Sequence, residues 1–160
     1  MLEVLVGMLV LALWMLSSAG LQMGALKFQK SAESRLTAVA LVSELGERME
    51  ANYLGARSGD YALVATDAAT VANTDCAAVT CQPNALAAFD LAQWTTRAAS
   101  TLKLTEVSVV DATPAGGITT YTISISWEEQ RGRQTYAAGA TPTTETMSYV
   151  TTKVVRNVAL

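Results

Sequence analysis

The sequence contains no histidine. The commonest general base, the Ser–His and Cys–His catalytic pairs and the most frequent transition-metal ligand are therefore absent. Lys and Arg are scattered and form no basic patch, which gives no support for nucleic-acid binding. Asp60, Asp67, Asp75 and Asp90 are too dispersed to nominate as paired catalytic carboxylates. We expect no enzymatic activity, no cofactor, no bound metal and no nucleic-acid partner.

Cysteine is also scarce, with Cys76 and Cys81 separated by four residues. Two cysteines with no histidine and no second pair do not complete a zinc site, and their spacing is not CxxC. In an oxidising compartment the simplest outcome is one disulfide. Because it would close a small loop, we expect it to stabilise the fold by about 2 kcal/mol. A metal site and a redox site are the alternatives.

One long apolar run is present, from Val4 to Leu26, and no charged residue interrupts it. As a helix it would span about 34 Å, enough to cross a hydrocarbon core of about 30 Å. No basic residue precedes the run, and it is longer than most signal-peptide apolar regions, so it predicts a retained transmembrane helix. Lys27 and Lys30 follow at once, ahead of the apparent globular part. If that part is exported, we expect basic residues upstream that have been removed.

A single carboxylate, Glu3, stands at the start of this run. A carboxylate at the edge of a membrane segment usually has a partner or a function. Its nearest candidate partner is an α-amino group, either its own or that of a neighbouring subunit. The alternative is that Glu3 lies among lipid headgroups and has no role.

An amphipathic helical pattern continues after the apolar run. Its apolar positions are Leu36, Val39, Leu41, Val42, Leu45, Met49 and Tyr53. Glu44 and Arg48 form a well-oriented i,i+4 pair, and Gly55 predicts the helix end. We expect one helix from about Met1 to Leu54, roughly 80 Å long.

Two glycines, Gly20 and Gly24, form a GxxxG motif within the predicted helix. The motif favours close packing between helices of different subunits. Alternatively, it is a point where the helix bends or unwinds, because glycine costs about 1 kcal/mol relative to alanine in a helix interior. Chance occurrence is the third interpretation.

The remaining chain predicts a mixed domain. Residues 55–75 look mostly irregular, with a short strand at Tyr61–Ala65, and a second helix is expected over about Ala85–Thr101. Alternating apolar and polar residues then predict strands around Val107–Val110, Tyr121–Trp127 and Thr146–Val158, with a turn at Pro114–Gly117. We expect an antiparallel meander of three or four strands, with helices covering one face.

The segment MLEVLVGMLVLALWMLSSAGLQ resembles the N-terminus of a mature type IV pilin. In that family a prepilin peptidase removes a short basic leader, leaving a few residues, then Glu, then an unbroken apolar helix. Glu3 matches the family's Glu, although only two residues precede it here where four are usual, so we expect two further residues in the mature chain. The resemblance implies that Glu3 neutralises the N-terminal amine of the adjacent subunit and thereby sets subunit register.

Two further stretches are similar to PilV-type minor pilins. The helix end carries Arg48, Met49 and Asn52, and the middle of the chain carries Ala87, Asp90 and Trp94 after the cysteine pair. We interpret Asp90 as a charge on the helix surface and Trp94 as a core aromatic, without a binding role. The resemblance implies the α+β type IV pilin fold: a long N-terminal helix, transmembrane in its first half and amphipathic in its second, packed on an antiparallel sheet of three or four strands.

That resemblance divides the chain into a transmembrane and filament-core helix (1–26), its amphipathic continuation (27–55) and a globular head (56–160). It implies a structural minor pilin that primes assembly, caps the tip and displays any adhesive surface. The implied partners are other minor pilins, the major pilin, the inner-membrane assembly platform, membrane lipid and, for the precursor, prepilin peptidase. The location would be the inner membrane, with the head in the periplasm, and then the extracellular pilus. The alternatives are a minor pseudopilin of a type II secretion system and a bitopic membrane protein with a periplasmic binding domain.

Overall fold

The computed structural model describes residues 2–66, 75–112, 118–130 and 144–155. In chain order the elements are α1 (Leu2–Ala51), α2 (Tyr53–Arg57), β1 (Leu63–Thr66), α3 (Pro83–Thr101), β2 (Leu104–Asp111), β3 (Thr119–Gln130) and β4 (Thr144–Val155). The chain forms two compact units, Met1–Ser34 and Arg35–Leu160, which we describe separately. The turn predicted at Pro114–Gly117 lies outside the described residues.

The first unit contains only α1. Every side chain from Leu2 to Ser17 is exposed there, including the apolar ones. By length and composition alone, α1 is long and apolar enough to cross a membrane. A helix that is apolar on all sides needs lipid or other helices around it, because water does not solvate such a surface favourably.

The long helix ends three residues earlier than the sequence predicts. The backbone of Asn52 leaves the helical region, with φ −105° and ψ 58°, and its side chain accepts a hydrogen bond from the backbone N–H of Gly55. Asn52 is thus the N-cap of the short helix α2. The prediction that Gly55 ends the helix is wrong, because Gly55 lies inside α2 and is buried.

The second unit has one hydrophobic core, to which α1 contributes a single stripe. Ala38, Leu41, Leu45 and Met49 are buried with side chains of α3 and the sheet. Their spacing of three or four residues places them on one face of the helix. Leu36 was expected on this face as well, but it is 71% exposed because it lies on the opposite side of the helix.

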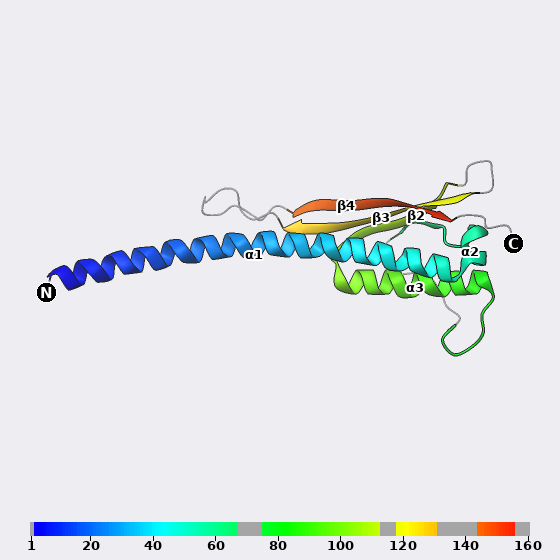
Figure 1. Ribbon diagram of the computed structural model, residues 1–160, viewed down its shortest axis with the longest axis horizontal. Helices are drawn as coiled ribbons and strands as arrows, with labels where there is room; N and C mark the ends of the chain where they lie inside the picture. The colour runs from blue at the N-terminus through cyan, green and yellow to red at the C-terminus, as the bar shows by residue number, and fades with distance from the viewer. Residues whose placement is uncertain (1, 67–74, 113–117, 131–143, 156–160) are drawn as a thin grey trace. The chain divides into compact units, whose positions relative to one another are not determined.

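The second helix, α3, begins at Pro83, as suits a residue without a backbone N–H in the first turn of a helix. Its buried stripe includes Ala87, Leu91, Trp94 and Ala98. The part of α1 from Arg35 onward and α3 lie on the same side of the sheet (Figure 1). The prediction of helices covering one sheet face is confirmed.

The sheet is antiparallel throughout, with the strand order β1-β2-β3-β4. The inner face of β3 carries Tyr121, Ile123, Ile125 and Trp127, all buried as the alternation predicts. β1 is short, and its pairing with β2 shifts register between Leu63 and Thr66. By contrast, β3 and β4 pair over twelve positions, from Thr119↔Val155 to Gln130↔Thr144. The prediction of an antiparallel sheet is therefore confirmed, with four strands.

Candidate functional site

The sequence-predicted assembly residues all lie on α1. Glu3 is in the first turn of the helix, where the positive end of the helix dipole favours a carboxylate. A Cβ added at Gly20 or at Gly24 would meet nothing within 4 Å. Both glycines therefore leave room for a side chain in the single subunit, so nothing inside the first unit requires their small size.

A group of polar residues fixes the end of α1 to α3. We call it the Arg48 cluster: Glu44, Arg48, Tyr61, Asp90 and Gln93. The Nη1 atom of Arg48 lies 3.0 Å from Oδ1 of Asp90 and 3.2 Å from Oε1 of Gln93, and Nη2 lies 3.0 Å from Oε1 of Glu44. The guanidinium thus joins a carboxylate of its own helix to a carboxylate of α3. The predicted i,i+4 pair of Glu44 and Arg48 is confirmed.

The second carboxylate oxygen of Asp90 also accepts a hydrogen bond. The Tyr61 hydroxyl donates a hydrogen bond of 2.6 Å to Oδ2 of Asp90 and lies 3.3 Å from the carbonyl oxygen of Arg48. Burial, together with this carboxylate, raises the pKa of Tyr61 well above its ordinary value. Asp90 itself is buried, so our interpretation of it as a surface charge is wrong.

The burial of Asp90 has a signal in the sequence. Asp90 occupies the apolar stripe of α3, between Ala87 and Trp94. A charged residue within such a stripe is buried on folding and therefore needs a partner. Tyr61 had no comparable signal, since it lies in a turn-rich segment and reaches Asp90 only through the tertiary fold.

Two more contacts join the helices beside the Arg48 cluster. Trp94, a core aromatic as predicted, is fully buried and its Nε1–H donates to the carbonyl oxygen of Leu41 at 2.8 Å. The Nδ2 atom of Asn52 donates to the carbonyl oxygen of Pro83 at 2.7 Å. Asn52 therefore caps α2 with its oxygen and holds the start of α3 with its nitrogen.

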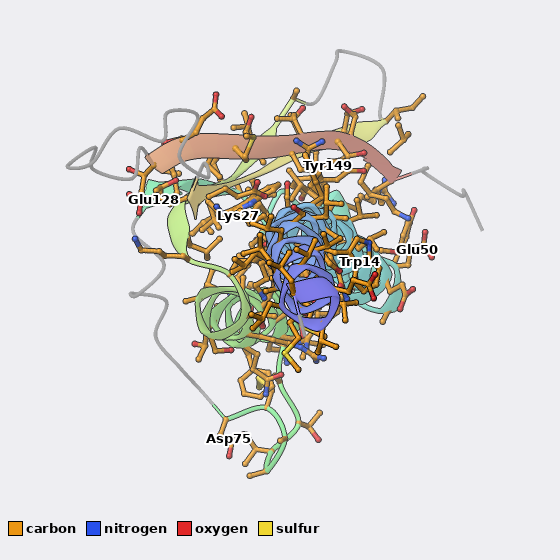
Figure 2. The ribbon with its side chains drawn as sticks, turned by 90° about the vertical axis from the view of Figure 1, so that its left-hand side faces the viewer. Trp14, Lys27, Glu50, Asp75, Glu128 and Tyr149 are labelled. Atoms are coloured by element: carbon orange, nitrogen blue, oxygen red, sulfur yellow. A yellow bond between two sulfur atoms is a disulfide. The ribbon has the colours of Figure 1, made fainter. Side chains whose placement is uncertain are left out.

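The two cysteines form a disulfide. The disulfide closes the loop from Cys76 to Cys81, and Asp75, just before this loop, accepts a hydrogen bond of 3.1 Å from the backbone N–H of Ala77. Figure 2 shows Asp75 in a loop beyond α3, on the side away from the sheet. No group of three or more His, Cys, Asp or Glu residues suited to a metal ion occurs in the described part of the chain.

A family model described as Type IV pilin Tt1218 matches residues 20–92. The match supports a type IV pilin. The matched range contains the second part of α1, α2, β1, both cysteines and the Arg48 cluster except Gln93. It does not include Glu3 or the strands β2–β4. Neither the curated proteins nor the solved structures gave a match.

The architecture of the chain is consistent with that family. A long N-terminal helix packs, from Arg35 onward, on a four-stranded antiparallel sheet, which is the arrangement of the type IV pilin fold. The Arg48 cluster joins the end of α1 to α3.

Proposed function

We propose that this chain is a structural minor pilin of a type IV pilus, one that primes assembly and caps the tip together with other minor pilins. The observation that carries the proposal is the start of α1: a carboxylate in the first turn, followed by an uncharged apolar helix. The family match to the next part of the chain supports it. Before assembly, α1 would anchor the chain in the inner membrane, with the globular head (56–160) in the periplasm.

In this proposal Glu3 sets the register between subunits. When apolar helices bundle, a carboxylate that remains unpaired costs several kcal/mol. Pairing with the N-terminal amine of the next subunit removes that cost at one axial position only. Gly20 and Gly24 would allow neighbouring helices to approach closely, because both lack a side chain and nothing in the first unit fills the space.

The test replaces Glu3 with Gln in the full chain and counts surface filaments in cells that hold the cognate pilus components. Gln keeps the shape of the side chain and removes its charge, so we expect most filaments to be lost. Glu33→Gln is the matched control, since Glu33 lies on the same helix and pairs with Lys30 in an exposed i,i+3 pair. An unchanged filament count in the Glu3 variant, with normal membrane insertion, would favour a bitopic membrane protein that does not assemble.

A minor pseudopilin would show the same dependence on Glu3, so a second measurement is needed. Deleting the chain should reduce surface filaments if it primes a pilus. It should leave filaments intact and reduce protein secretion if it belongs to a secretion system.

A further inference from the structure

The edge strand β4 is long and regular and, among the described residues, has few of the features that protect a sheet edge from pairing with another chain. All twelve of its residues pair with β3 without a register shift, and it contains no proline. Its charged residues, Glu145 and Lys153, lie near its two ends, so Thr146–Thr152 is uncharged. Proteins usually protect a long edge with a bulge, a proline, a covering segment or inward-pointing charges, and of these β4 shows, within the described residues, inward-pointing charge such as Lys153, which pairs with Glu50 of α1. Among the described residues, no backbone hydrogen bond joins β4 to any segment other than β3.

The opposite edge of the sheet is different. β1 has only four residues, and its register with β2 shifts within that length. A short, irregular edge offers few backbone groups to another strand. Within the described part of the chain, the long edge that is free to pair is therefore β4.

A groove runs between α1 and the inner face of β4. It has a volume of about 430 Å³, and its lining includes Val39, Val42, Gly46, Glu47, Tyr149 and Lys153. Successive side chains of a strand point to opposite faces. A strand added beside β4 would thus place every second side chain toward this groove, while its backbone completed the sheet.

The charges around the groove favour a basic occupant. Lys153 forms an ion pair with Glu50, which leaves its charge compensated. Glu47 also lines the groove and is exposed, and within the described residues it forms no ion pair. A Lys or Arg facing Glu47 would gain a charge-assisted hydrogen bond.

We propose that β4 accepts an extended, basic segment of a different pilin subunit as a fifth strand, with apolar and basic side chains in the α1–β4 groove. The identity of the partner as a pilin subunit rests on the proposed function. The edge strand and the groove are features of the structure and are independent of that function.

A second copy of this chain fits the edge less well. Antiparallel pairing of β4 with β4 relates the two heads by a twofold axis perpendicular to the strands. It would make Arg35–Ala51, which runs along the sheet (Figure 1), point in opposite directions in the two copies, whereas subunits of one filament share a direction. Pairing of β4 with β1 of another copy would engage only four residues.

The test uses the full chain in detergent micelles and the synthetic peptide Thr-Val-Thr-Lys-Thr-Val-Thr as a probe. Its Val and Lys side chains share one face, as the groove requires. Amide hydrogen exchange across Thr144–Val155 is measured with and without the peptide, and we expect it to slow at least ~10-fold. The same peptide with Glu in place of Lys should slow exchange much less.

A pair of variants separates edge pairing from nonspecific binding. Thr151 pairs with the buried Ile123 and lines the groove, so Thr151→Lys places a charge where side chains of the added strand would lie. Thr146→Lys makes the same change on the outer face of β4, opposite Glu128. We expect Thr151→Lys to abolish the slowing of exchange and Thr146→Lys to keep it.

Three results would overturn the proposal: no slowing with the Lys peptide, equal slowing with the Glu peptide, or full slowing in Thr151→Lys. Because the probe requires no filament, its outcome is independent of the Glu3 experiment. If the chain binds the peptide but does not assemble into filaments, the result would support strand addition at β4 and refute the pilin role.

Discussion

The hydroxyl of Tyr61 donates a 2.6 Å hydrogen bond to Asp90, a residue 29 positions further along the chain. The other carboxylate oxygen of Asp90 accepts a hydrogen bond from Arg48. Asp90 therefore connects three segments: the turn after α2, the end of α1 and the middle of α3. A buried carboxylate is stable only when its oxygens are paired in this way. Asp90 is therefore a structural residue, and it holds the end of α1 against α3.

Removing Asp90 should destabilise the fold strongly. We expect Asp90→Ala to lower the free energy of unfolding by about 3 kcal/mol, because Arg48 and Tyr61 lose their shared acceptor. Urea unfolding of the full chain in micelles, followed by tryptophan fluorescence, measures this. Arg97→Ala is the control: Arg97 is 65% exposed and lies 3.5 Å from Glu44, so we expect a change within about 0.5 kcal/mol. Similar values for the two variants would contradict the structural role of Asp90.

Two buried glycines should differ in how replacement by alanine changes the stability of the fold. A Cβ at Gly55 would lie 2.6 Å from Nδ2 of Asn52 and 2.8 Å from the carbonyl oxygen of Pro83. Gly55→Ala would therefore break the Asn52–Pro83 hydrogen bond, at a cost of about 2 kcal/mol. At Gly46 the nearest atom would be the Cδ of Lys153 at 3.6 Å. Gly46→Ala should be neutral or stabilise α1 by up to about 1 kcal/mol. Thermal unfolding of both variants tests the pair, and equal destabilisation would be inconsistent with this packing.

Stability should fall at alkaline pH because of two buried tyrosines. Burial, and then the charge of Asp111, raises the pKa of Tyr121 to about 12, and the pKa of Tyr61 is raised further. Above about pH 10 the unfolded chain releases phenol protons that the folded chain retains. The contribution of the protonated tyrosines to the free energy of unfolding is thus complete below about pH 10. It is lost as pH rises toward the folded-state pKa, and the free energy of unfolding falls by up to about 1.4 kcal/mol per pH unit for each tyrosine.

Urea unfolding between about pH 9 and pH 11.5 measures this loss. Lysines titrate in the same range, so the double variant Tyr61→Phe/Tyr121→Phe serves as the reference. It should show a clearly smaller decrease of the unfolding free energy. An identical pH dependence in both chains would rule out a contribution from the tyrosines.

Alanine at Gly20 and Gly24 should separate helix stability from assembly. Neither position has an atom within 4 Å of an added Cβ, so the double variant should insert normally and gain up to about 2 kcal/mol of helix stability. If the glycines serve contact or unwinding between subunits, filament number should nevertheless fall. Gly7→Ala makes the same change nearer the start of α1, also in open space. Equal filament counts in all three chains would indicate that the GxxxG motif has no role.

The sequence by itself determined the features that depend on local periodicity. The uncharged run after Glu3 specifies an all-apolar helix, and the alternation from Tyr121 to Trp127 specifies a strand with one buried face. Pro83 and the spacing of Leu91, Trp94 and Ala98 specify α3 within two residues at its start. Each follows from how side chains repeat along 3.6-residue and two-residue periods.

Only the tertiary structure decided which of these faces meet. Periodicity shows that a helix has an apolar stripe, but not what covers it, so Leu36 was expected inside and is exposed, while Asp90 was expected outside and is buried. The end of α1 likewise depends on Asn52, whose amide caps α2 and reaches Pro83, 31 residues away. These outcomes depend on contacts between distant segments, and burial is a property of the assembled layers rather than of any one helix or strand.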